Sequence, residues 1–125
     1  MASIKISDSI LESVKKLINA EGDEYFDTDI IIHINTVFSV LQQMGVGPCE
    51  GFSIDDNKST WDEFTEDEPL FNMVKTYMAL RVKLFFDIAS ASSYYITQLQ
   101  AQADELEWRL RAAAEVNKLE VSDNA

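Results

Sequence analysis

Few side chains in this sequence of 125 residues could perform catalytic chemistry. His33 is the single histidine and Cys49 the single cysteine, so a catalytic base or a metal site would have to be built from one imidazole and carboxylates. His33 lies at the edge of an apolar stripe, a position typical of a hydrogen-bonded structural histidine. The sequence also holds neither a Gly-rich phosphate loop nor a nucleophile elbow. We therefore expect a protein that is not an enzyme, with no catalytic residues and no cofactor.

One acidic segment matches part of a calcium-binding pattern. Positions 1, 3, 5, 9 and 12 of an EF-hand loop are matched by Asp55, Asn57, Ser59, Glu63 and Glu66. Thr60, however, stands where the sharp turn of such a loop requires Gly, and Asp62 replaces the usual apolar residue. Chance matches are frequent in so acidic a segment, so we interpret it as a solvated loop and expect no bound metal.

The net charge of −12 is concentrated in two short segments. Residues 21–29 hold five acids and no base, and residues 50–68 hold eight acids against Lys58 alone. The rest of the chain is balanced, with nine acids and nine bases. Because no basic patch is available to neutralise phosphates, direct nucleic-acid binding is disfavoured.

Size and composition predict one folded domain. A chain of this length with 46% apolar residues can bury a sufficient core without disulfides or a metal. We expect a single domain over residues 1–120 and a frayed tail over residues 121–125. The N-terminus lacks the pattern of a secretion signal, and no stretch reaches the roughly 18 apolar residues of a membrane span, so we expect neither export nor a membrane partner.

Hydrophobic periodicity predicts an all-α fold, a small bundle of about four helices. The helices are expected over residues 8–20, 28–44, 68–87 and 92–119. The third is apolar nearly all round and should be the central helix. Residues 45–67 should form a long acidic loop between the second and third helices, in which Thr60 and Glu63 are spaced to cap one turn carrying Trp61.

The long C-terminal helix is expected to have two apolar faces. One face is a seam with alternating steps of three and four residues, formed by Ile96, Leu99, Ala103, Leu106, Leu110 and Ala113. The opposite face carries Tyr94, Ala101, Trp108, Ala112 and Leu119. A helix packed on one side only has no use for the second face, so we predict a subunit or partner interface there, with Ile32 of the second helix as a further exposed candidate. Alternatively, Trp108 lies beneath the acidic loop of its own chain.

Read in order, several segments resemble the head-tail connector, or adaptor, proteins of tailed bacteriophages and prophages. The resemblance spans residues 4–116 and is carried by Phe26-Asp27-Thr28-Asp29, His33-Ile34-Asn35, Gly45-Val46-Gly47-Pro48, Gly51-Phe52, Trp61-Asp62-Glu63-Phe64, Val74-Lys75-Thr76-Tyr77, Val82-Lys83-Leu84-Phe85-Phe86-Asp87 and Glu105-Leu106-Glu107-Trp108-Arg109-Leu110. The family often has prolines after the phenylalanine-aspartate pair, where this chain has Ile88-Ala89. The turn between the last two helices is therefore less rigidly set.

The resemblance implies a structural subunit at the head-tail junction of the virion. During assembly such a subunit would be in the host cytoplasm. The resemblance also implies a homo-oligomeric ring below the portal protein that contacts a tail-side connector or stopper protein and lets DNA pass without sequence-specific binding. Carboxylates that face such a channel would repel the DNA backbone. The candidates for that lining are Asp55, Asp56, Asp62, Glu63, Glu66, Asp67 and Glu68.

An acidic DNA mimic that occupies a host DNA-binding protein is the alternative function. A small acidic chain would suit that role. A mimic should spread its carboxylates along a surface with phosphate-like spacing, whereas the predicted helices here are balanced in charge. The position of the carboxylates in the folded chain therefore separates the two hypotheses.

Overall fold

The computed structural model describes residues 3–87 and 92–123, with the side chains of the last helix described as far as Val116. Five helices and no strand occur in these residues, so the predicted all-α class is confirmed. The helices are α1 (Ile10–Leu17), α2 (Asp27–Gln43), α3 (Trp61–Phe64), α4 (Glu68–Asp87) and α5 (Ser93–Asp123). One helix more is present than the four expected, and it is the single turn α3.

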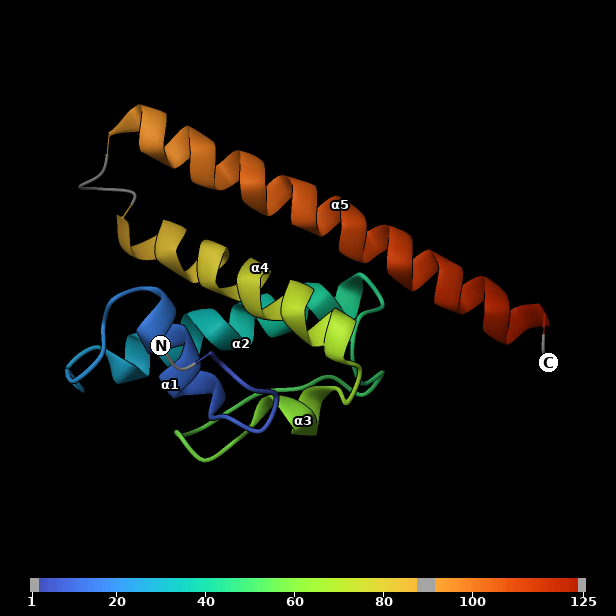
Figure 1. Ribbon diagram of the computed structural model, residues 1–125, viewed down its shortest axis with the longest axis horizontal. Helices are drawn as coiled ribbons and strands as arrows, with labels where there is room; N and C mark the ends of the chain where they lie inside the picture. The colour runs from blue at the N-terminus through green and yellow to red at the C-terminus, as the bar shows by residue number, and fades with distance from the viewer. Residues whose placement is uncertain (1–2, 88–91, 124–125) are drawn as a thin grey trace.

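Helix α4 lies at the centre of the molecule, as its apolar sequence predicts. It contacts α5 on one side and α1 and α2 on the other (Figure 1). Its buried side chains therefore come from more than one face of the helix and are Phe71, Val74, Tyr77, Met78, Val82 and Leu84. The two-sided burial explains why α4 shows almost no hydrophobic periodicity.

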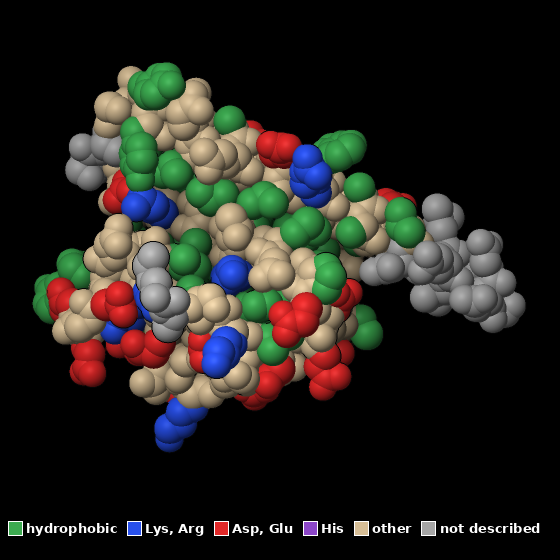
Figure 2. Space-filling model, viewed as in Figure 1, with side chains coloured by type: hydrophobic (Ala, Val, Ile, Leu, Met, Phe, Trp, Pro, Cys, Tyr) green, Lys and Arg blue, Asp and Glu red, His purple; other side chains and the backbone are tan. Residues whose placement is uncertain are grey.

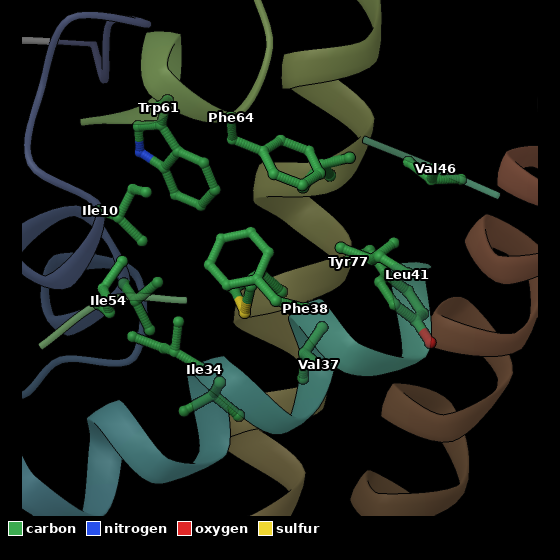
Figure 3. Packing of buried hydrophobic residues seen from close by; sticks show 14 of the residues in the cluster. Ile10, Ile34, Val37, Phe38, Leu41, Val46, Ile54, Trp61, Phe64 and Tyr77 are labelled. Atoms are coloured by element: carbon green, nitrogen blue, oxygen red, sulfur yellow. The ribbon is translucent and has the colours of Figure 1, made fainter. Parts of the chain in front are cut away.

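The connection between α2 and α4 folds back onto the core. The side chains of Trp61 and Phe64 point from α3 toward Phe38 of α2 (Figure 3), and both are buried. The predicted capping box is present, since Glu63 accepts a hydrogen bond of 2.6 Å from the backbone N–H of Thr60. Asn35 of α2 exchanges two hydrogen bonds with the backbone of Ile54, at 2.9 and 2.8 Å, which fixes the middle of the connection.

Glycine is required where this connection leaves α2. Gly47 has φ +88°, and a β-carbon there would lie 2.4 Å from the ring of Phe64. Residues near the N-terminus close the other side of the connection, because the N–H of Ile10 donates to Ser59 and the N–H of Asp62 donates to Ile6.

The bounds of three helices differ from the prediction. Helix α1 covers less than residues 8–20 and is followed by Asn19 in the left-handed region, with φ +63°. Helix α2 starts one residue early, at Asp27, and has no side-chain cap. Helix α5 continues to Asp123 instead of ending near Leu119, so residues 121–123 are helical where a frayed tail was expected, and residues 124–125 lie outside the described part.

Asp27, in the first turn of α2, forms an ion pair with Lys15 of α1. The Lys15 Nζ lies 2.8 Å from Asp27 Oδ1, and the lysine side chain is almost fully buried. Its hydrogen bond to the carboxylate raises the pKa of Lys15 above its usual value, against the opposing effect of burial. This pair joins α1 to the first turn of α2.

Candidate subunit interface and acidic face

The inner face of α5 is held against α4 by the predicted seam. Leu99, Ala103 and Leu110 are buried, and Ile96 and Leu106 pack beside them. The two helices are also joined by a hydrogen bond, in which the Tyr77 hydroxyl donates to Glu107 at 3.5 Å. Burial and the neighbouring Glu107 carboxylate both raise the pKa of Tyr77. The seam orients the helix and so determines which side chains face outward.

The outer face of α5 is exposed. Tyr94 is 75% exposed and Trp108 69% exposed, and Ala101 and Ala112 are exposed beside them. Trp108 therefore does not lie beneath the acidic connection, and that alternative is wrong. The side chain of Leu119 lies outside the described part. Burying the exposed part of such an indole on a partner would contribute roughly 2–4 kcal/mol.

The C-terminal part of α5 extends past the body of the molecule (Figure 1). Ala114 is the last described side chain of α5 that packs on the core. Val116 follows the Trp108–Ala112 stripe at the same spacing of four residues and is 53% exposed. We call residues 115–123 the overhang. Val116 was not among the residues predicted for this face, because its position beyond the body depends on where the other helices end.

A second exposed apolar surface was missed by sequence reasoning. Five rings follow one another in contact, with centroids 4.2–6.2 Å apart, in the order Tyr25, Phe26, Phe86, His33 and Phe85. We call this set the aromatic arc. It lies where α2 begins and α4 ends, and its outermost ring, Tyr25, is 83% exposed. Ile32, a predicted interface residue, is exposed on the same helix as His33.

His33 packs among aromatic rings, and its role as a hydrogen-bonded structural histidine stays a prediction. Its imidazole stacks on the ring of Phe85 at 4.2 Å and 9° and meets Phe86 edge-on. Among the described residues, no three His, Cys, Asp or Glu side chains are arranged to hold a metal ion. Glu63, a member of the calcium-like pattern, caps α3 by accepting a hydrogen bond from the backbone N–H of Thr60.

Most of the acidic side chains visible in Figure 2 gather below α5, although α5 carries some as well. All seven predicted channel residues are exposed: Asp55, Asp56, Asp62, Glu63, Glu66, Asp67 and Glu68. Within the described chain, no ion pair joins any of them to a base. The exposed pairs Glu105–Arg109 and Glu107–Arg111 keep α5 nearly balanced in the same region where Trp108 is exposed. The connection between α2 and α4 thus exposes carboxylates that form no ion pair in the described chain, whereas α5 carries ion pairs beside Trp108.

Comparison with known proteins identifies one family. A family model described as phage connector protein matches residues 10–117. No curated protein and no solved structure matches the chain. None of the described helices is long and apolar enough to cross a membrane.

Proposed function

The chain belongs to the phage connector protein family, and on that premise we propose that its copies assemble as a closed ring below the portal. A structural role in the connector at the head-tail junction follows from the family itself. The ring, the portal protein above it and a tail-side connector or stopper protein below it are the proposed parts. The match over residues 10–117 is the observation that carries the proposal.

The outer face of α5 supports assembly. A ring subunit meets two neighbours through two different surfaces, so it must expose more apolar area than a monomer needs. Trp108 provides an aromatic anchor of the kind that dominates interface energies, and the flanking Ala101 and Ala112 let another backbone approach. Tyr94, Leu119 and Ile32 are further members of the proposed contact surface.

The acidic connection is proposed to face the DNA channel. Its carboxylates are exposed, and no ion pair joins them to a base in the described chain. Facing a channel, they would repel the phosphate backbone and let DNA slide, whereas basic groups would grip it. DNA would then pass without sequence-specific contacts.

The alternative of an acidic DNA mimic gains no support. Its carboxylates would have to follow a duplex-like surface, whereas here they are concentrated in two connections. The helices that expose apolar side chains carry paired charges instead.

Electron microscopy of the chain with its portal tests the ring. Purified chain added to the portal of the same phage should produce a second ring stacked on one end of each portal particle. In the matched control, serum albumin, an acidic protein that is unrelated to the portal, is added in place of the chain. Portal particles that stay unchanged at saturating concentrations of the chain would refute the proposed ring.

A further inference from the structure

We infer that the outer face of α5 in the free chain is covered by the outer face of α5 in a second copy. The two helices run antiparallel about a two-fold axis at Trp108. This pairing is separate from the proposed ring, because it concerns the chain before it meets the portal. The residues involved lie between positions 101 and 115, within the part of the helix whose side chains the structure describes.

The outer face has the shape that such a pair requires. Trp108 is 69% exposed, and the exposed Ala101 and Ala112 lie on the same face. Side chains of a helix lean toward its N-terminus, so in an antiparallel pair centred on Trp108 each indole lies over Ala112 of the other copy. The small methyl group there leaves room for the indole and lets the two helices approach closely.

The order of charges along α5 selects the antiparallel direction. Glu105 and Glu107 come just before Trp108, and two bases, Arg109 and Arg111, follow it. In an antiparallel pair centred on Trp108, the acids of each helix lie beside the bases of the other. In a parallel pair, each of these groups would lie beside its own copy, and like charges placed together are unfavourable.

The other two acids of this stretch also avoid like charge in the antiparallel pair. Asp104 precedes Trp108 by four positions, so it lies opposite Ala112, which follows by four. Glu115 follows Trp108 by seven positions, so it lies opposite Ala101. No acid between positions 101 and 115 therefore lies opposite another acid. Because exposed ion pairs are weak, these charges determine the direction of the pair and add little affinity.

The two arginines can serve both helices. Arg109 contacts Glu105 at 3.0 Å, and Arg111 contacts Glu107 at 2.9 Å, in each case through one guanidinium nitrogen. A guanidinium group has five N–H donors. Each arginine can therefore bind a carboxylate of the second copy while it keeps the contact within its own helix.

The bodies of the two copies do not collide in this arrangement. The core packs on α5 through Leu99, Ala103 and Leu110, which lie on the side of the helix opposite to Trp108. Each body therefore lies on the far side of its own α5, away from the second helix (Figure 1).

The pair should be weak and reversible. Fifteen residues of helix are about 22 Å long and about 10 Å wide, so the contact covers less than the roughly 800 Å² per partner of a stable complex. The pair covers the same face that is proposed for the ring contact. Free chains would then be kept from assembling with one another until the portal binds them.

Disulfide trapping tests both the pair and its direction. In a Cys49→Ser background, one chain carries Ala101→Cys and a second carries Glu115→Cys, two exposed positions that lie opposite each other in the antiparallel pair. The mixture is oxidised without portal, and the linked chains are counted by mass spectrometry. The 101–115 disulfide should form at least about tenfold faster than the 101–101 or 115–115 disulfide, because pairing raises the effective concentration of the two thiols.

Gln102→Cys replaces Ala101→Cys in the matched control. Position 102 is exposed but lies about 120° from Trp108 around the helix, so the 102–115 disulfide should form about tenfold more slowly than the 101–115 disulfide. In sedimentation equilibrium, the wild-type chain should pass from monomer to dimer between roughly 10 µM and 1 mM, the range of a weak complex. Trp108→Asp should remain monomeric, whereas Gln102→Asp should dimerise as wild type does.

Each outcome decides the inference. A 101–115 rate equal to that of the control overturns it, as does a wild-type chain that stays monomeric over the whole concentration range. Preferred 101–101 and 115–115 disulfides would mean that the helices pair in parallel, which also overturns it. If rings stack on the portal although the free chain forms no 101–115 disulfide, the pairing is wrong and the proposed ring stands. If the disulfide forms and no ring does, the pairing stands and the proposed function fails.

Discussion

At the scale of single residues, Trp108 is a large apolar side chain in a solvent-exposed position. An indole that is 69% exposed contributes little to the stability of the monomer and much to any contact that covers it. Trp108→Asp should leave helix content and the thermal midpoint of the monomer unchanged and should weaken self-association or portal binding at least about thirtyfold. Circular dichroism and light scattering measure the two effects.

A charge-matched variant separates contact from charge in that experiment. Gln102→Asp adds the same charge at an exposed position about 120° away around α5, so it should assemble normally. Loss of helix together with assembly in Trp108→Asp would place the indole in a structural role and contradict the prediction.

The Lys15–Asp27 pair is the residue-scale feature that should matter most for stability. Asp27→Asn removes the partner of a nearly buried ammonium group and should lower the free energy of unfolding by about 1.5–3 kcal/mol in urea titrations. Asp29→Asn removes a similar charge from the same first turn at an exposed position and should cost only a few tenths of a kcal/mol. Equal losses in the two variants would contradict a stabilising ion pair.

The pair also predicts a loss of stability in alkali. The folded pKa of Lys15 is raised above its unfolded value near 10.5, so its contribution is complete below that pH and is lost as pH rises through the folded pKa. Tyr77 has a raised pKa as well. Folding therefore favours its neutral hydroxyl, and this contribution to the free energy of unfolding is lost as pH rises above about 10. Urea titrations between about pH 8 and pH 12 span the ordinary pKa values of lysine and tyrosine. The free energy of unfolding should decline more steeply over this range in wild type than in Tyr77→Phe.

Sequence reasoning found the outer face of α5 but missed the aromatic arc, for a physical reason. A face can be read from a 3.6-residue period only when the helix has a polar side, as α5 has. Phe85 and Phe86 belong to α4, which is apolar nearly all round, and Tyr25 and Phe26 precede α2 in an acidic connection. The arc exists only because tertiary packing brings these two places together.

Among the elements, α5 differs from the others because it is longer than the body that supports it. The helix spans 31 residues, and its described contacts with the core end at Ala114. A chain that stops after Glu115 should therefore keep its thermal midpoint within a few degrees, because Leu99, Ala103 and Leu110 remain. It should fail to assemble, as measured by sedimentation velocity.

A second truncation is the control for that experiment. A chain that stops after Asp123 retains the whole overhang and should assemble as wild type does. Assembly by the shorter chain would show that the overhang is not a contact surface.

Helix identities were predictable from sequence, and several boundaries were not. The limits of α4 match the prediction, because Pro69 in its first turn and the acidic run before it are strong local signals. The end of α1 depends on the left-handed conformation of Asn19, and the start of α2 depends on an ion pair with another helix. Such boundaries are set by tertiary contacts that no local pattern encodes.

At the scale of the whole molecule, negative charge is concentrated in two segments, residues 21–29 and 50–68. The proposed channel role predicts that Asp55→Asn, Asp56→Asn and Asp62→Asn together leave assembly intact and slow DNA release from filled particles severalfold. Fewer carboxylates would repel the phosphate backbone less as it passes. The release rate from particles built with this variant is the measurement.

The first acidic segment provides a matched set of changes. Glu21→Gln, Asp23→Asn and Glu24→Gln remove equal charge from exposed positions of that segment, so they should leave the rate of DNA release per assembled particle unchanged. Equal effects of both sets on DNA release would mean that total charge matters and that the acidic connection does not line the channel.

The unequal burial of the two tryptophans gives the chain two built-in optical probes. Trp61 is fully buried and its indole N–H has no hydrogen-bond partner in the described residues, so Trp61→Phe removes a chromophore without breaking a polar contact. The fluorescence of that variant comes from Trp108 alone and should shift to shorter wavelength, with less quenching by acrylamide, when a partner covers the helix. Trp108→Phe leaves Trp61, whose emission should change only when the core itself opens. Assembly and unfolding can therefore be followed separately without attaching a dye.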